Sequence, residues 1–268
     1  MQVKIENWIC YSYEEPVSFS THAIRLFPRT DQSIITKHFQ TTLNIESDVQ
    51  YRRDLFDNIV ANCFLPKPAR VLEIRVALEV ELWPKNPFHF LLSPHALELP
   101  FEYTPDESQV LAPFRAVAPE EQADANAIWR LTGKQNTVEA LVEFADTLHR
   151  EIAYEVREEG SARLPAETIE MRSGACRDTA LLCATILRQI GLAVRVVSGF
   201  LCEFRVDTKE RRAQSGLHAW VDVFLPGAGW VGIDPTNGTF CDHRFIPTAV
   251  GARMTDIAPI QGSYFGKQ

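Results

Sequence analysis

Residues 173–200 constrain the fold of this chain more than any other stretch, because they predict a buried helix followed at once by a buried strand. After Cys176, apolar side chains recur at helical spacing: Ala180, Leu181, Ala184, Leu187 and Ile190. Gly191 stands where a left-handed cap would end the helix. Residues 194–197 (Val-Arg-Val-Val) then indicate a buried strand. Cys176 is therefore expected in the first turn of a core helix.

The position of Cys176 bears on its chemistry. At a helix start, the positive end of the helix dipole and nearby backbone N–H groups favour thiolate over thiol. Thiolate is the nucleophilic form, so this position is one way for an enzyme to activate a cysteine. The alternative is packing, because most free cysteines are small buried hydrophobic residues. This stretch alone favours packing, and the rest of the chain decides.

Length and composition indicate a folded globular protein and exclude several classes of function. At 268 residues, 46% of them hydrophobic, the chain can bury a large core as one large domain or two modest ones. The net charge of -8 and the pI near 5.4 argue against a nucleic-acid partner. The N-terminus lacks the apolar core of a signal peptide, and no apolar run could span a bilayer. We expect a soluble, cytoplasmic protein with no membrane partner.

Six cysteines are spread over the chain, at positions 10, 63, 176, 183, 202 and 241. Without Cys-x-x-Cys pairs or the compact spacing of a secreted domain, they predict reduced thiols. Cys183, two turns along the same helix, should be buried and inert. A zinc site can be imagined from Cys202, His218, Cys241 and His243. Because these lack ligands paired at short spacing, we expect no metal, and no cofactor.

The first part of the chain predicts a β-rich domain. Runs at 9–13, 22–27, 40–45 and 71–82 mix β-branched or aromatic residues with alternating polar ones. In the last run Leu72, Ile74, Val76, Leu78, Val80 and Leu82 face one way. Glu73, Arg75, Glu79 and Glu81 lie on the opposite face, so one side is core and the other solvent. Breaks are expected at 28–31, 48–57 and 66–68, which fits a β-meander or sandwich.

Seven prolines punctuate residues 83–119, a composition that cannot support a long helix and is typical of a connection between domains. We place the boundary at its end. Residues 1–118 then form an N-terminal β-rich accessory domain with its proline-rich connection, and residues 119–268 form the second domain. Helices are expected only after Pro119. The first long one spans 138–152, with Thr137 as its N-cap and His149 as an ordinary helix histidine.

Residues 218–234 predict a β-hairpin, because two alternating runs flank the turn Pro-Gly-Ala-Gly. Alternation puts His218, Trp220 and Asp222 on one face of the first strand. Trp230, Gly232 and Asp234 share a face of the second. If the loop is centred on Pro226 or Gly227, opposed residues have numbers that sum to roughly 452 or 454, counted by strand pairing. His218 then lies opposite Asp234 or one pair away from it, on the same face.

A His–Asp pair of this kind supplies what a nucleophilic cysteine needs. The imidazole takes the thiol proton and later protonates the leaving group, while the carboxylate holds the imidazole in the useful tautomer. Side chains on a two-stranded ladder come close enough for that hydrogen bond. Taken singly, His218 could be a satisfied core histidine and Asp234 an Asp-Pro turn former. Together, in the order Cys176, His218, Asp234, they predict a catalytic triad.

Three segments carry a resemblance to a known family: 172–180 (Arg-Ser-Gly-Ala-Cys-Arg-Asp-Thr-Ala), 191–201 (Gly-Leu-Ala-Val-Arg-Val-Val-Ser-Gly-Phe-Leu) and 218–238, with His-Ala-Trp-Val-Asp-Val and Ile-Asp-Pro-Thr-Asn-Gly. They resemble the bacterial transglutaminase-like superfamily, often described as cysteine proteases. The resemblance covers about residues 137–265. The N-terminal part, with Tyr-Ser-Tyr-Glu-Glu-Pro-Val at 11–17, is similar to the accessory domain that accompanies this core.

The resemblance implies an α+β fold. Its core would be papain-like, with the helix that bears the cysteine packed on an antiparallel sheet, and an N-terminal β-sandwich-like domain would precede it. Nucleophile, base and orienting carboxylate would fall on Cys176, His218 and Asp234. Arg177 and Asp178 match the same motif, and we interpret them as helix-start and packing residues.

The expected activity is cysteine-dependent acyl transfer on the amide bonds of peptides or proteins through a thioester, most simply as a peptidase or amidase. An amine in place of water would give transglutaminase-type transamidation. Both stay open, as does a non-catalytic peptide-binding module on the same fold. The backbone N–H of Cys176 is an expected oxyanion donor. Tyr154 is a candidate second donor and, with Trp220, a candidate substrate-binding residue; the oligomeric state is open.

Overall fold

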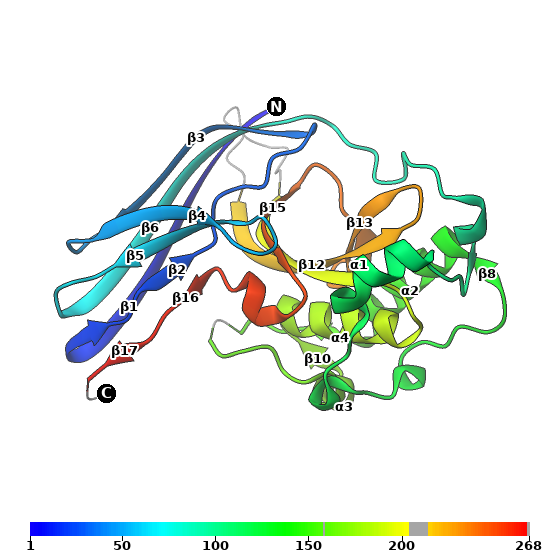
Figure 1. The fold of residues 1–268 in the computed structure, drawn as a ribbon. Helices are drawn as coiled ribbons and strands as arrows, with labels where there is room; N and C mark the ends of the chain where they lie inside the picture. The colour runs from blue at the N-terminus through cyan, green and yellow to red at the C-terminus, as the bar shows by residue number, and fades with distance from the viewer. Residues whose placement is uncertain (158, 204–213, 267–268) are drawn as a thin grey trace.

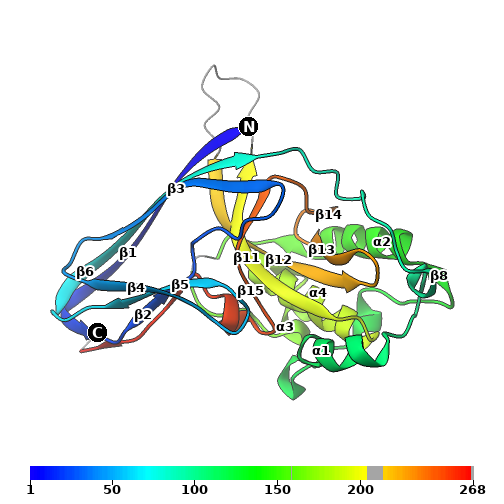
Figure 2. The ribbon, with the colours of Figure 1, turned by 45° about the horizontal axis from the view of Figure 1, so that its top comes forward.

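The computed structural model describes residues 1–157, 159–203 and 214–266. The first part of the chain forms β-sheets, and the second part places helices beside another sheet, as Figures 1 and 2 show. All three of the larger sheets are antiparallel. The predicted α+β fold is confirmed.

Two four-stranded sheets make up the N-terminal part. The first joins, in order, β17 (Tyr264–Phe265), β1 (Gln2–Phe19), β6 (Ala69–Leu82) and β3 (Ile34–Leu43). The second joins β16 (Ile260–Gln261), β2 (His22–Ile24), β5 (Ile59–Phe64) and β4 (Asp48–Arg53). Ile5 of β1, Leu78 of β6 and Cys63 of β5 belong to one hydrophobic core between the sheets. This arrangement confirms the β-sandwich-like expectation.

Strand β6 is the long central strand that the alternation predicted. Its six apolar side chains from Leu72 to Leu82 are all buried. One expectation nearby is wrong, because residues 48–53 form strand β4 and not a break. Its charged residues are tolerated because β4 is the edge strand of its sheet, where most of its side chains are exposed to solvent.

The proline-punctuated segment contains a helix, α1 (Pro105–Arg115), so the expectation of no helix before Pro119 is wrong. Pro105 occupies the first turn, where its missing N–H costs nothing. Thr104 and Glu107 form a reciprocal capping box, in which the Thr104 hydroxyl accepts from Glu107 N and the Glu107 carboxylate accepts from Thr104 N. This capping box is a helix-start signal in the sequence, but the many prolines around it favour the prediction of an irregular segment.

The second part is built around a five-stranded sheet. Its order is β14 (Thr239–Phe240), β13 (Gly229–Asp234), β12 (Gln214–Leu225), β11 (Val194–Glu203) and β15 (Phe245–Gly251). The longer helices are α2 (Thr137–Glu151), α3 (Pro165–Met171) and α4 (Cys176–Gln189). Two-stranded pairs join β7 (Glu98–Leu99) to β8 (Gln135–Asn136) and β9 (Ala153–Tyr154) to β10 (Ser173–Gly174). Short 3-10 turns lie at Pro94–Ala96, Pro119–Glu121, Ala125–Ala127 and Met254–Ile257.

Helix α4 packs on this antiparallel sheet, as expected. Cys183 and Leu187 of α4 share a core with Val196 of β11 and Val221 of β12. Helix α2 buries the predicted face, including Phe144. Its N-cap, however, is Asn136 and not Thr137. The Asn136 side chain accepts from the N–H groups of residues 138 and 139, and Thr137 Oγ1 instead donates to the carbonyl of Ala96.

The end of the chain returns to the N-terminal part, which the sequence did not predict. Strands β16 and β17 pair with β2 and β1, and in Figures 1 and 2 the red strands β16 and β17 lie beside them. Phe200 and Ile246 of the second part also belong to the core between the first two sheets. The domain boundary near residue 118 stays a prediction.

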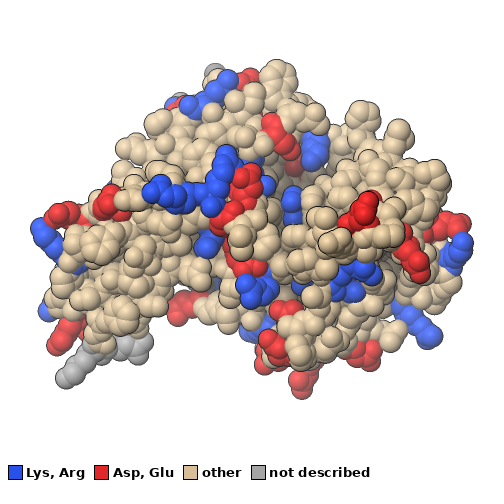
Figure 3. Space-filling view, viewed as in Figure 1, with Lys and Arg blue, Asp and Glu red and all other residues tan. Residues whose placement is uncertain are grey.

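The surface and helices carry two further observations. No helix within the described ranges is long and apolar enough to cross a bilayer. On the face shown in Figure 3, acidic and basic side chains are interspersed. The absence of nucleic-acid and membrane partners stays a prediction.

Gly199 of β11 gives a test of the packing between β11, β12 and β15. A Cβ there would lie 2.7 Å from the Trp220 ring and 2.8 Å from the Cα of Pro247, and it would collide with the Ile246 carbonyl. Because backbone atoms cannot yield, we expect Gly199→Ala to lower the free energy of unfolding by about 3 kcal/mol in urea titration. At Gly216 in β12 a Cβ would meet no atom of the described residues within 4 Å, so Gly216→Ala should cost less than about 1 kcal/mol. Equal losses in the two variants would refute this account.

Candidate active site

Cys176 is the first residue of α4, where the sequence placed it. The buried carboxylate of Asp178 fixes this helix start, because its Oδ2 accepts from Ala175 N at 2.9 Å. Its Oδ1 accepts from Arg163 N at 2.8 Å and pairs with the Arg157 guanidinium at 2.5 Å. Asp178 is thus the helix-start residue we expected, and it also ties the preceding loop to the helix.

Further contacts hold the chain around Cys176. Strand β10, which ends two residues before the cysteine, pairs in parallel with β9. The Arg163 guanidinium binds both carboxylate oxygens of Glu155, at 2.7 and 3.0 Å. Arg177 donates to the backbone carbonyls of Arg157 and Glu159. The thiol therefore lies on a backbone that is fixed from both sides.

The hairpin register is the second of the two alternatives, because Phe224 pairs with Trp230 and Val221 with Ile233. Asp234 is consequently one pair away from His218, and its Oδ2 lies 3.0 Å from His218 Nε2. Asp234 has no exposed surface. A carboxylate only accepts, so Nε2 carries the proton of this hydrogen bond.

The Cys176 thiol is hydrogen-bonded to the side chain of His218. Burial raises the pKa of this thiol. The hydrogen bond and charge of His218, the backbone N–H of Ala219 and the charge of Arg177 outweigh burial, and the net pKa lies below the ordinary value. Burial likewise lowers the pKa of His218, but its hydrogen bonds to Asp234 and Cys176 raise it to about 10. The pair therefore favours thiolate and imidazolium.

Two residues that the sequence did not single out complete the carboxylate's surroundings. The Asn237 side-chain amide donates to Asp234 Oδ2 at 2.6 Å, and Thr236 N donates to Oδ1 at 3.0 Å. His149 of α2 anchors the same turn, since its Nδ1 lies 2.7 Å from the Thr236 carbonyl oxygen. The sequence Asp-Pro-Thr-Asn at 234–237 is typical of a turn in which the Asp side chain binds the backbone that follows it. The contact with Thr236 N could therefore have been predicted from the sequence. The role of His149 had no local signal.

The two candidate substrate-binding residues lie in different settings. Trp220 is only 2% exposed, and its ring stacks beneath His218 with centroids 6.2 Å apart at 26°. It therefore supports the imidazole and has almost no surface for a substrate. Tyr154 is 60% exposed. Partial burial raises the pKa of the Tyr154 hydroxyl, and the charge of nearby Cys176 raises it further. Tyr154 alone could contact a substrate.

The other thiols differ from Cys176. Burial raises the pKa of Cys63 to about 11 and that of Cys202 to about 12, and it also raises the pKa of Cys183 and Cys241. Cys10 is exposed. Within the part of the chain that the structure describes, no group of three or more His, Cys, Asp or Glu side chains is placed to hold a metal ion. A thiolate beside an imidazolium and a buried carboxylate can perform nucleophilic acyl transfer.

Two family models match the chain. Residues 126–235 match the transglutaminase-like superfamily, and residues 3–81 match the bacterial transglutaminase-like N-terminal region. Together they cover well over half of the chain and agree with each other. The first match contains Cys176, His218 and Asp234, and the second contains most of the N-terminal sandwich.

Relatives and solved structures extend over nearly the whole chain. An uncharacterised protein of Mycobacterium leprae is 26% identical over 272 residues, which is 96% of this chain and 91% of the relative. One of Mycobacterium tuberculosis is 28% identical over 277 residues, 94% of this chain and 84% of the relative. A crystal structure described as that of a candidate cysteine protease from Cytophaga hutchinsonii aligns with a TM-score of 0.69 at 16% identity, covering 99% of this chain and 88% of that one. This likeness shows a shared fold. Residues 126–235 are a core of the transglutaminase-like superfamily, and residues 3–81 ahead of it are a bacterial transglutaminase-like N-terminal region.

Proposed function

We propose that this protein is a cysteine-dependent acyl-transfer enzyme that hydrolyses amide bonds in peptides or proteins. The observation that carries the proposal is the position of His218, which is hydrogen-bonded to the Cys176 thiol on one side and to buried Asp234 on the other. Membership of the transglutaminase-like superfamily supports a cysteine-dependent enzyme in general. Peptide or amide hydrolysis is the more specific step that we add.

In the acylation step, Cys176 Sγ attacks the amide carbonyl carbon as a thiolate. The carbonyl oxygen takes negative charge, which the backbone N–H of Cys176 at the helix start would stabilise. We assign the second donor to the Tyr154 hydroxyl. The C–N bond then breaks, the imidazolium of His218 gives its proton to the departing amine, and a thioester to Cys176 remains.

In the deacylation step, water attacks the thioester while neutral His218 takes its proton. The C–S bond breaks, Cys176 leaves as thiolate, and the carboxylic acid is released beside a re-formed imidazolium. Asp234 keeps the imidazole oriented throughout because it holds Nε2 and leaves the other ring nitrogen for the thiol. An amine in place of water would give a new amide, which is transamidation.

We place this activity in the cytoplasm.

The first prediction concerns the reactivity of the thiol. Because the pKa of Cys176 is lowered and that of His218 is raised, a larger fraction of Cys176 than of an ordinary cysteine should be thiolate at pH 6, and Cys176 should react faster with iodoacetamide there. In His218→Ala, burial is no longer opposed by the imidazolium, the pKa rises, and labelling at pH 6 should slow by about 100-fold or more. Peptide mass spectrometry of the labelled protein measures both rates. Labelling at the same slow rate as Cys10, unaffected by His218→Ala, would favour a non-catalytic module.

The second prediction separates hydrolysis from transamidation. Peptide substrate libraries are incubated with and without a primary amine, and mass spectrometry distinguishes free acid from new amide. We expect free acid to predominate, with more than about a 1,000-fold loss of turnover in Cys176→Ala. Amide as the main product would assign the amine as natural acceptor. Full turnover by Cys176→Ala would exclude the mechanism altogether.

The third prediction tests the surroundings of Asp234. Asn237→Ala removes the amide that donates to Asp234 Oδ2, so the carboxylate should hold His218 less firmly and kcat should fall about tenfold. The matched control is Thr236→Ala, which keeps the backbone N–H that binds Asp234. The pH profile of iodoacetamide labelling should shift toward higher pH in Asn237→Ala alone. If both variants lose activity equally and neither profile moves, the turn acts only on folding.

A further inference from the structure

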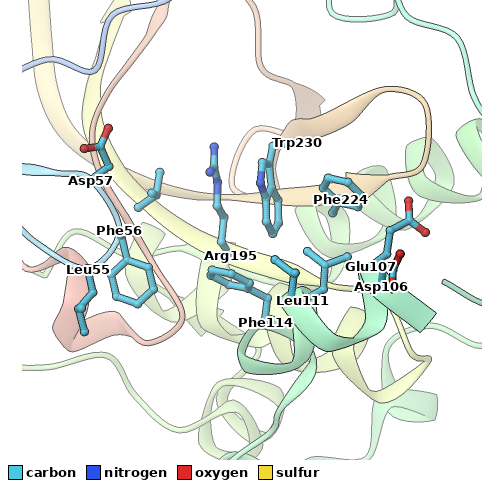
Figure 4. A pocket seen from close by; sticks show the side chains of 12 residues that line it. Leu55, Phe56, Asp57, Asp106, Glu107, Leu111, Phe114, Arg195, Phe224 and Trp230 are labelled. Atoms are coloured by element: carbon cyan, nitrogen blue, oxygen red, sulfur yellow. The ribbon is translucent and has the colours of Figure 1, made fainter. Parts of the chain in front are cut away.

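A concave site lies away from the thiol. It has a volume of about 620 Å³ and is formed by the turn Leu55–Asp57, helix α1 and the β11–β13 face of the five-stranded sheet (Figure 4). None of Cys176, His218 and Asp234 lines it. Phe224, which does, is six residues along β12 from His218, or about 20 Å at the rise of a strand. We call this site the interface pocket.

The walls of the interface pocket are aromatic and interlocked. Phe114 of α1 meets the Trp230 ring edge-on at 5.1 Å, and Trp230 meets Phe224 at 5.4 Å. Phe56, from the N-terminal part, contacts Phe114 at 6.1 Å. In Figure 4 these rings line the space between the turn and the helix. A volume of this size with aromatic walls is typical of sites that bind small molecules or short peptide segments.

The turn that forms one wall is held rigidly. Asn58 is fully buried, and its side chain bonds both backbone groups of Val250, donating to the carbonyl at 2.8 Å and accepting from the N–H at 2.9 Å. Arg29 donates to the carbonyls of Phe56 and Asp57. The wall from the first part of the chain is therefore fixed against the sheet of the second part, and the pocket does not depend on a ligand to form.

Two apolar side chains at the rim of the interface pocket are unusually exposed to solvent. Leu55 is 99% exposed and Val110 is 73% exposed, and both line the pocket. Exposed apolar surface beside a preformed pocket is typical of a site where a partner is bound, because the partner removes that surface from water.

The charges at the pocket favour a cationic partner. The Arg195 guanidinium stacks over Trp230 at 4.5 Å and is paired with Asp222 through two contacts of 2.8 and 2.9 Å, so its charge is matched within the protein. In Figure 4, Asp106 and Glu107 lie at one end and Asp57 at the other, with the aromatic rings between. Asp57 pairs with Arg53 on the surface, where such a pair is weak. The net charge of -8 acts in the same direction.

We propose that the interface pocket binds a peptide segment in which a large apolar side chain is flanked by Lys or Arg. The apolar side chain would occupy the aromatic walls, and the flanking cations would face the carboxylates at the two ends. The pocket is open to solvent rather than enclosed, which suits a segment of chain. This binding does not depend on the chemistry of Cys176, so it can be tested in a protein without the thiol.

The test uses isothermal titration of the Cys176→Ala protein with two blocked tripeptides, acetyl-Lys-Phe-Lys-amide and acetyl-Glu-Phe-Glu-amide. We expect a Kd below about 1 mM for the basic peptide and at least tenfold weaker binding of the acidic one. Raising the salt concentration should weaken the binding of the basic peptide only. No heat from the basic peptide at several-fold higher concentration, or equal affinity for both peptides, would overturn the proposal and leave the mechanism at Cys176 untouched.

A variant pair assigns the binding to this pocket. Val110→Arg places a cation on the pocket rim at a solvent-exposed helix position, and the basic peptide should bind at least tenfold more weakly. Val142→Arg adds the same charge at an exposed position of α2, outside the pocket, and should leave the Kd within about twofold. Equal weakening in both variants would show general attraction to an acidic protein, and no weakening in Val110→Arg would place the peptide elsewhere; either result refutes the proposal.

Discussion

The buried carboxylate of Asp234 is the constraint on which the candidate active site depends. A carboxylate without exposed surface must be hydrogen-bonded, because leaving it unpaired would cost about 3–5 kcal/mol. Three donors meet this need: the imidazole of His218, the amide of Asn237 and the backbone N–H of Thr236. Satisfying the charge therefore also orients the imidazole. The state of the Cys176 thiol depends in turn on that imidazole, so the buried charge acts on the nucleophile through one intermediate residue.

A second buried carboxylate, that of Asp178, fixes the position of the cysteine. Asp178 caps α4 through the N–H of Ala175 and pairs with Arg157 from the preceding loop. The nucleophile and its base thus come from separate segments, each fixed by its own carboxylate. The N-terminal sandwich is joined to this core by shared apolar residues such as Ile246 and by the two hydrogen bonds of Asn58 with Val250. A site assembled at that junction, the interface pocket, is preformed for this reason.

Much of this arrangement could be predicted because it is written in short-range patterns. Alternation along 71–82 predicts a half-buried strand wherever the chain lies, and the turn after Leu225 limits the hairpin to two registers, of which the structure has one. The sequence pattern does not predict helix α1 and strand β4, because prolines and charged residues are typical of breaks between elements. A capping box and an edge position made those residues acceptable, and the edge position is a property of the sheet and not of the segment.

The sequence by itself determined the type of most elements, the residue at the start of α4, and the kinds of side chain that a nucleophilic site requires. Only the tertiary structure decided that Asp234 is buried, that Trp220 lies under His218, and that the chain end pairs with β1 and β2. The physical reason is range. Helical and strand periodicity arises between near neighbours in the chain, whereas burial, pKa and pocket shape arise from side chains that distant segments bring together.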